Sequence, residues 1–368
     1  MALATTGLLF AGGTALAPPS KGWSIVPAPK QFATLNALGV VSGGDVWAGG
    51  YLYDANRAAY DAASYHWDGK RWSNLSTSIA SAGYNAFNGI AGAAHNDVWG
   101  VGYWTPAYYT TAYHPLVEHF DGSSWKVVAV KEDPSLDAGT LNAVSALGRR
   151  NAWAVGYTDD YHALVGHWDG ASWTLSNPLG NALAQLYTVT ALSSTNVWAA
   201  GSISDAKGRV LPLVLHWDGA AWSISPSPKV PRKNNVLNDI AFNATGQVGF
   251  AVGVQSEPYH NPTVPNKALA EVWNGAAWSR SRTDAIPWAF LYGVCVDHKG
   301  TPWAVGYRGD RGAAPLFERW SNNGWHEQSV LPRNASGVVT AVADDGSTLW
   351  AVGWSSAQIG GALIMRER

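Results

Sequence analysis

Three dipeptides that pair a tyrosine with an acid or a histidine could carry chemistry: Tyr60-Asp61, Tyr113-His114 and Tyr161-His162. Adjacent phenol and imidazole groups can act as general base and general acid. An arginine such as Arg308 could neutralise a uronate carboxylate during β-elimination. Carboxylates at Asp61, Asp159 and Asp160 offer the pair that glycoside hydrolysis requires. These residues indicate one alternative, an enzyme that acts on polysaccharide.

A metal is the weaker interpretation of the same residues. His114, His162 and Asp61 have the side-chain types of a ligand set. Their separation in the chain follows no ligand spacing, so we expect no metal and no cofactor. Neither a glycine-rich phosphate loop nor a Gly-x-Ser-x-Gly nucleophile motif occurs in the sequence.

A repeated heptapeptide must position these groups. The stretch 151–157, Asn-Ala-Trp-Ala-Val-Gly-Tyr, recurs along the chain with anchors about 45 to 54 residues apart, a period typical of propeller blades. The seven anchors are Trp47, Trp99, Trp153, Trp198, Phe250, Trp303 and Trp350. The position that closes the motif varies more: Tyr51, Tyr103, Tyr157 and Tyr307 give way to Ser202, Val254 and Trp354.

Each repeat contains four strand signals. A short apolar run such as 141–147 precedes the anchor strand, a third strand ends near Trp-Asp-Gly, and a fourth begins at the next tryptophan. Asp-Gly between aromatic runs is a strong hairpin signal, because glycine tolerates the positive φ of a tight turn. The prediction is an all-β, seven-bladed β-propeller of four-stranded antiparallel blades. Residues 22–26 supply the fourth strand that the last repeat lacks, which closes the ring.

The repeats resemble bacterial secreted propellers with tryptophan-rich blades, and the resemblance spans residues 22–368. The Asp-Gly-x-x-Trp turn is similar to a shortened Asp-box of sialidase-type propellers. It lacks the Ser or Thr two residues before the Asp and the Asp-x-Gly spacing, so no sialidase catalytic residue is carried over. The order of motifs also differs from that of WD40 repeats. Seven-bladed polysaccharide lyases are a similar architecture, with His, Tyr and Arg on one face, but fold does not fix function.

Composition limits the location and the partners. Residues 1–20 look like a truncated signal peptide without its basic start, and 21–368 form one propeller domain, so we expect secretion. The apolar run is too short to span a membrane. Only 14% of residues are charged and the net charge is −2, which argues against nucleic-acid binding. We expect a monomer without membrane insertion. The single cysteine, Cys295, is interpreted as a buried small hydrophobe.

Strand direction places the loops between second and third strands, and the connections between blades, on one face, called the top face here. Most of the 21 tryptophans occupy repeat positions that packing explains, whereas Trp104, Trp288 and Trp354 do not. All three map to the top face, with Tyr60, Tyr109 and Asp160. First-strand residues around the channel mouth could bind a polar ligand or ordered water: Asn36, Asn88, Asn142, Tyr187, Asn238 and Tyr292.

Exposed aromatic rings with neutral amides and few charges suit a carbohydrate, because sugar faces stack on rings while hydroxyls bond to side chains. The sequence therefore predicts an extracellular propeller that binds a carbohydrate or another polar small ligand, with the polysaccharide-degrading enzyme as the alternative. Catalysis is left open. One pocket lined by Tyr113, His114, Tyr161, His162 and Arg308 would favour an enzyme. Scattered groups with an open Trp104–Trp354 platform would favour a lectin-like module.

Overall fold

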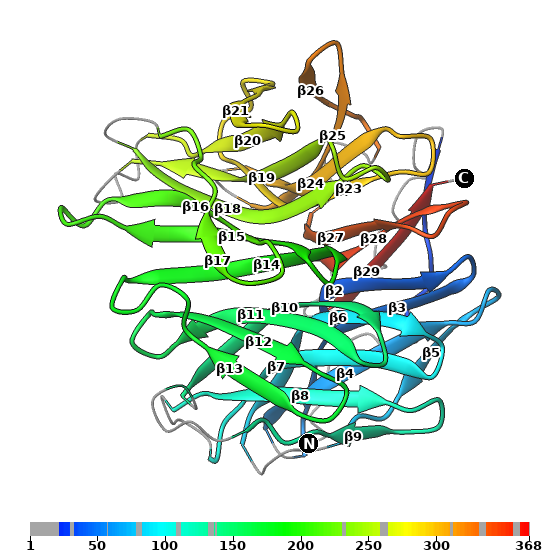
Figure 1. Cartoon of the computed structure of the whole chain (residues 1–368). Helices are drawn as coiled ribbons and strands as arrows, with labels where there is room; N and C mark the ends of the chain where they lie inside the picture. Colours follow the sequence, from blue (N-terminus) through cyan, green and yellow to red (C-terminus); the bar gives the residue numbers. More distant parts are fainter. Residues whose placement is uncertain are drawn as a thin grey trace, which may run out of the picture.

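The computed structural model consists of β-strands arranged as seven sheets around a central axis (Figure 1). It describes residues 22–29, 33–56, 58–78, 83–107, 112–131, 136, 138–229, 233–257, 264–309, 312–330, 336–355 and 361–367. Within these ranges no residue is helical. The predicted all-β, seven-bladed β-propeller is confirmed.

The blades follow one another along the chain, each from its innermost to its outermost strand. Blade 1 is β2 (Ala33–Ser42), β3 (Asp45–Asp54), β4 (Ala59–Trp67) and β5 (Trp72–Leu75). Blade 2 is β6 (Asn85–Ala94), β7 (Asp97–Trp104), β8 (His114–Phe120) and β9 (Trp125–Val127). Blade 3 is β10 (Gly139–Gly148), β11 (Asn151–Thr158), β12 (Ala163–Trp168) and β13 (Trp173–Ser176). Blade 4 is β14 (Ala184–Ser193), β15 (Asn196–Ser204), β16 (Val210–Trp217) and β17 (Trp222–Ile224).

The last three blades include two departures from this pattern. Blade 5 is β18 (Asn234–Phe242), β19 (Gly249–Ser256), β20 (Lys267–Trp273) and β21 (Trp278–Arg280). Blade 6 is β23 (Ala289–Val296), β24 (Pro302–Arg308), β25 (Ala314–Ser321) and β26 (Gly324–Glu327), and a short strand β22 (Arg282–Thr283) adds in parallel to β26. Blade 7 is β27 (Val338–Asp344), β28 (Leu349–Ser355), β29 (Gly361–Glu367) and the N-terminal β1 (Trp23–Ile25).

The ring closes as the sequence predicts. Strand β1 pairs with β29 in antiparallel register, Trp23 opposite Glu367 and Ile25 opposite Met365. Just beyond the strand, the Val26 amide donates to the Ile364 carbonyl at 2.8 Å. In Figure 1 the blue N-terminal strand lies against the red C-terminal one. The two ends of the chain thus complete one blade, and no open sheet edge is left between the first and last blades.

The strongest side-chain contact between blades is an aromatic wedge. The anchor ring of each blade reaches into the next blade and meets the tryptophan that opens its outer strand, usually with a second ring beside it. Trp99 lies 5.0 Å from Trp168 and 5.2 Å from Trp173 between ring centroids, the second at an interplanar angle of 84°. The same arrangement joins Trp47, Trp153, Trp198, Phe250 and Trp350 to two rings of the following blade. At the seventh junction Trp303 meets Trp23, which β1 supplies.

A second ring of contacts lines the channel. Each innermost strand has a β-bulge, and a polar residue stands at the extra position: Asn36, Asn88, Asn142, Tyr187, Asn238, Tyr292 and Thr340. The four asparagines donate their amides to a backbone carbonyl of the next blade at 2.8–3.0 Å. The Thr340 hydroxyl donates to the Leu35 carbonyl at 2.7 Å. These side chains therefore tie blade to blade through backbone acceptors.

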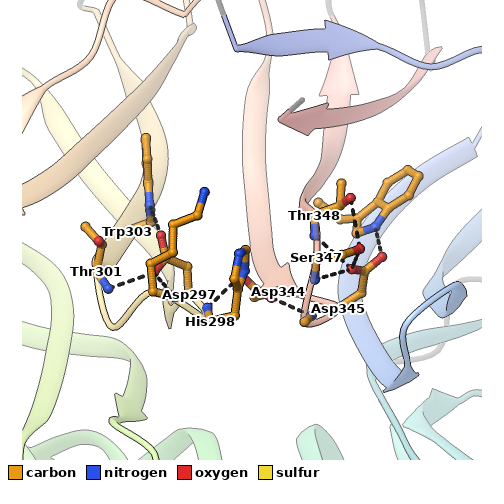
Figure 2. A network of polar contacts seen from close by, with 11 residues as sticks. Asp297, His298, Thr301, Trp303, Asp344, Asp345, Ser347 and Thr348 are labelled. Carbon is orange, nitrogen blue, oxygen red and sulfur yellow. Dashed lines mark hydrogen bonds and ion pairs between the residues drawn. The ribbon is translucent and has the colours of Figure 1, made fainter.

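The turns of the opposite face, called the bottom face, hold the anchor rings from below (Figure 2). Asp297 accepts backbone bonds from Lys299 and Thr301 and a bond from the Trp303 indole at 3.1 Å. Asp345 accepts the Trp350 indole at 2.9 Å in the same way. Between these two turns, His298 Nδ1 lies 2.8 Å from Asp344 Oδ2 across the junction of blades 6 and 7. The carboxylates of Asp297 and Asp345 thereby each fix both a turn and an indole.

Histidines before the Trp-Asp-Gly turn serve the same packing. His66, His167 and His216 lie face to face or tilted against the anchor ring of their own blade, at centroid separations of 4.1–4.4 Å. His119 contacts Trp99 at 4.4 Å. In blades 6 and 7 the equivalent position carries Arg319 and Arg366, whose guanidinium groups lie over Trp303 and Trp350. A cation–π contact replaces the imidazole there.

Trp99→Ala should lower the free energy of unfolding by about 3–5 kcal/mol, because it opens a large cavity between blades 2 and 3. Ile224→Ala is the control, since Ile224 is 54% exposed and should change stability by less than about 0.5 kcal/mol. Urea denaturation of the three proteins measures both values. A loss below about 1 kcal/mol for Trp99→Ala would show that the wedge does not hold the ring together.

Three buried glutamates occupy one equivalent position of the third strand, in blades 2, 5 and 6: Glu118, Glu271 and Glu318. Glu118 accepts the Ser78 amide at 2.9 Å, and Glu271 accepts the Ser227 hydroxyl at 2.6 Å, so each holds the connection that arrives from the preceding blade. Within the described residues neither carboxylate oxygen of Glu318 has a hydrogen-bond partner. Desolvation raises the pKa of Glu118 and Glu271 to about 7 and that of Glu318 to about 8.

These acids make stability fall as the pH rises. Between the ordinary glutamate pKa and these raised values the folded chain binds more protons than the unfolded chain, so the free energy of unfolding decreases from about pH 5 to pH 8. Glu318→Gln should be more stable than the parent by on the order of 1–3 kcal/mol at pH 8 and nearly equal to it at pH 5. Denaturation at both pH values tests this. Parallel profiles would mean that Glu318 is ionised in the folded chain.

Candidate functional site

A cavity of about 730 Å³ opens on the top face between blades 2 and 3. It is lined by Asn88, Tyr103, Tyr113, Thr140, Asn142, Tyr157, Asp159 and Tyr161. Four of the eight lining residues are tyrosines, three are neutral polar residues, and one is a carboxylate. Tyr113 of blade 2 and Tyr161 and Asn142 of blade 3, which the sequence indicates from two adjacent repeats, therefore meet in one cavity.

Tyrosines of the top face are arranged as equivalent pairs on three adjacent blades. Each pair joins the tyrosine that closes the anchor motif to a tyrosine at or just before the start of the third strand. The centroids lie 5.2 Å apart for Tyr51–Tyr60, 5.1 Å for Tyr103–Tyr113 and 6.2 Å for Tyr157–Tyr161. Each of Tyr60, Tyr113 and Tyr161 stands six residues before the histidine that pairs with the anchor of its blade, which agrees with the predicted equivalence. These three rings are 42%, 40% and 57% exposed, so the row faces solvent.

Burial keeps two of the cavity phenols, Tyr103 and Tyr157, protonated. Desolvation, with smaller contributions from Tyr113, Tyr51 and Tyr60, raises the pKa of Tyr103 to about 12. Burial and the neighbouring Tyr161 likewise raise the pKa of Tyr157. Both hydroxyls are therefore neutral at physiological pH, where each can donate and accept a hydrogen bond. The wall combines apolar ring surface with neutral hydrogen-bonding groups.

One of the exposed rings, that of Tyr161, stands on a strained backbone. Tyr161 has φ of +64°, a conformation that a side chain disfavours by about 1–2 kcal/mol. The Thr158–Tyr161 turn imposes it: the Tyr161 amide donates to the Thr158 carbonyl at 2.8 Å, and the Tyr161 carbonyl accepts the Ala184 amide of blade 4. Strain of this kind persists only where surrounding contacts over-determine it.

Glycine at position 161 should be more stable than alanine at the same position. Tyr161→Gly should exceed Tyr161→Ala in free energy of unfolding by about 0.5–1 kcal/mol, the relief of positive φ less the greater freedom of glycine in the unfolded chain. Urea midpoints of the two variants give the difference. An alanine variant equal to or above the glycine variant would show that the turn relaxes in solution.

The predicted acid–base and charge partners of the tyrosines do not line the cavity. His114 lies 4.5 Å from Trp104 in a stacked arrangement, and His162 Nδ1 lies 3.1 Å from the Ala182 carbonyl. Arg308 stands on blade 6, where it forms an ion pair with Glu327 at 2.8 Å. The predicted set Tyr113, His114, Tyr161, His162 and Arg308 is thus divided: the tyrosines line the cavity, and the two histidines and the arginine contact other groups.

The three tryptophans outside the repeat also belong to separate places. Trp104 ends β7 of blade 2, Trp288 precedes β23 with φ of +57°, and Trp354 lies in β28 of blade 7. All three are half-buried, and none lines the cavity. They do not form the single platform considered above. Tyr60 and Asp61 lie on blade 1, Asp160 is exposed in the turn beside Asp159, and Tyr109 lies outside the described residues.

Around the axis, a second cavity of about 430 Å³ follows the channel. The predicted residues Asn142, Tyr187, Asn238 and Tyr292 line it. The side-chain amides of both asparagines donate hydrogen bonds to backbone carbonyls of the next blade, and the Tyr187 hydroxyl donates to Gln185 at 2.9 Å. Cys295 lies on the same wall, where desolvation and nearby aspartates raise its pKa well above the usual value. Cys295 is half-buried, whereas the sequence interpretation had it buried, and its raised pKa keeps the thiol protonated.

The ligand set considered from sequence, Asp61, His114 and His162, does not assemble, and that interpretation is wrong. In the part of the chain that the structure describes, one group of three metal-ligating side chains does assemble, Asp45, His66 and His95, on the bottom face. His66 stands just before the Trp-Asp-Gly turn, a position that packing against the anchor ring already explains. Thr140 of the cavity was also missed; its one signal is its position two residues before Asn142, on the same side of β10.

No family model matches this chain, and no curated protein matches it. Several solved structures do match this chain. A PL25 ulvan lyase bound to -[GlcA(1-4)Rha3S]- superposes with a TM-score of 0.64 at 10% identity, over 92% of this chain and 95% of the lyase. YCF48 bound to a D1 peptide gives 0.58 at 14% identity, over 96% and 99%. The WD40 β-propeller domain of Doa1 gives 0.57 at 13%, over 94% and 97%. At these identities the likeness establishes the propeller fold alone.

A search of the described residues for a helix long and apolar enough to cross a membrane finds none.

Proposed function

We propose that this protein is an extracellular carbohydrate-binding propeller whose ligand occupies the tyrosine-lined cavity between blades 2 and 3. The observation that carries the proposal is the lining itself, four tyrosines with two asparagines, a threonine and one aspartate. Pyranose rings present an apolar face and a rim of hydroxyls, and this wall offers aromatic faces beside neutral donors and acceptors. No Lys, Arg or His is among the lining residues, so the ligand favoured is a neutral glycan.

The row of tyrosine pairs supports a glycan longer than one sugar. Tyr51 and Tyr60 on blade 1 contribute electrostatically to the raised pKa of Tyr103, so they lie close to the cavity wall. Tyr60 also contacts Tyr53 at 5.4 Å and Tyr84 at 5.8 Å. Aromatic surface therefore continues from the cavity toward blade 1, where further sugar units of one chain would stack.

The alternative, a polysaccharide-degrading enzyme, draws support from Asp159, the one carboxylate in the cavity, and from fold likeness to a polysaccharide lyase. A uronate lyase needs a cation to neutralise the substrate carboxylate, and Arg308 is paired with Glu327 on blade 6. A glycoside hydrolase needs a second carboxylate, for which the exposed Asp160 is the nearest in sequence. The contacts of the cavity favour binding over both reactions.

A panel of neutral and uronate-containing polysaccharides tests the proposal, scored for binding and for absorbance of unsaturated uronate products. We expect binding of at least one neutral glycan without turnover, and an affinity about five- to thirtyfold lower in Tyr113→Ala, because a stacking ring is worth about 1–2 kcal/mol. Ile224→Ala is the control, since Ile224 is exposed on the outer strand of blade 4 and does not line the cavity, and Tyr53→Ala reports on the outer tyrosine row.

Three results would contradict the proposal. Binding to no glycan in the panel would remove it. Production of unsaturated or reducing ends, lost on Asp159→Asn, would replace it with the enzyme. Equal loss in Tyr113→Ala and Tyr53→Ala would place the ligand on the outer tyrosine row instead of in the cavity.

A further inference from the structure

The bottom face carries a cluster of three ligand groups at the junction of blades 1 and 2. Asp45 begins β3, His66 lies in β4, and His95 lies in the turn between β6 and β7 of the next blade. His66 Nε2 is 2.8 Å from Asp45 Oδ1, and His95 Nδ1 is 3.0 Å from Asp45 Oδ2. One ligand atom from each residue lies within 4.8 Å of the other two.

Two members of the cluster are fixed by the aromatic wedge. The indole of the fully buried Trp47 donates to Asp45 Oδ1 at 2.8 Å, and the His66 ring stacks on the same indole at 4.4 Å and 30°. His95 is different, because its side chain is 58% exposed. A ligand at this point would meet two preorganised groups and one accessible imidazole, with solvent on the open side.

Comparison with the other blades shows that the third group is special to this junction. The repeat needs only the pair for packing: His119 Nε2 lies 2.8 Å from Asp97, and His216 Nε2 lies 2.9 Å from Asn196. The position of His95 is taken by Arg149 before blade 3's anchor strand and by Ser194 before that of blade 4. At the junction of blades 6 and 7 the bottom face has a single His298–Asp344 pair (Figure 2).

We propose that Asp45, His66 and His95 bind a divalent transition metal, with zinc as the best fit. Two imidazole nitrogens and one carboxylate oxygen form a ligand set that zinc accepts, with water in the fourth position. Tetrahedral bonds of about 2.0–2.1 Å place ligand atoms about 3.3 Å apart, so ligand atoms that now lie within 4.8 Å of one another would approach by up to about 1.5 Å. The metal replaces the two His–Asp hydrogen bonds and links blade 1 to blade 2.

Isothermal titration of the untagged full chain with zinc chloride tests the site, together with the melting temperature at increasing zinc. The parent should bind one equivalent, and its melting temperature should rise by several degrees at saturating zinc. His95→Ala and His95→Asn should weaken binding at least tenfold and abolish the rise, while they leave the metal-free melting temperature nearly unchanged. His298→Ala, which removes another bottom-face histidine paired to an aspartate, should bind zinc as the parent does.

The proposal is overturned if the parent takes up no zinc, or if the His95 variants bind it as well as the parent. Loss of binding in His298→Ala with retention in the His95 variants would place the metal at the junction of blades 6 and 7. None of these outcomes depends on the glycan proposed for the top face, because the two sites lie on opposite faces of the ring.

Discussion

The structure depends on the insertion of one large ring from each blade into an aromatic pair of the next. Trp99 between Trp168 and Trp173 is the pattern, with both partners nearly perpendicular or tilted as aromatic edges and faces prefer. With a single cysteine the chain cannot form a disulfide within itself. The ring of blades is therefore held closed by burial of these aromatic rings and by the hydrogen bonds that side-chain amides donate from one blade to the next. The ring is complete only because Trp23 from the N-terminal strand supplies the partner of Trp303.

That constraint separates the scaffold from the candidate site. Positions that form the wedge recur in almost every blade, and their side chains are engaged in packing. The residues of both candidate sites lie instead at or beyond the ends of strands, where the motif-closing residue and the loop beyond it differ between blades. At these positions blades 1 to 3 carry tyrosine pairs on the top face, and blade 2 carries His95 on the bottom face. The proposed functions therefore stand at departures from the repeat.

Much of the fold could be predicted from sequence, because each strand carries a local signature that is repeated and because Asp-Gly turns fix the hairpins. The equivalence of Tyr60, Tyr113 and Tyr161 followed from the same register. What could not be predicted is which side chains are already engaged. Stacking of His114 on Trp104, the contact of His162 with the Ala182 carbonyl and the pairing of Arg308 with Glu327 join loops or strands 10 to 20 residues apart, and no local pattern specifies them.

A crystal structure of the protein soaked with a neutral oligosaccharide tests the central claim most directly, that the departure from the repeat in blades 2 and 3 forms the ligand site. The account predicts sugar density between Tyr113 and Tyr161, with a ring face against a phenol and hydroxyls within hydrogen-bond distance of Asn142 or Asp159. Sugar bound on the bottom face, or in the channel, with an empty tyrosine cavity would contradict it.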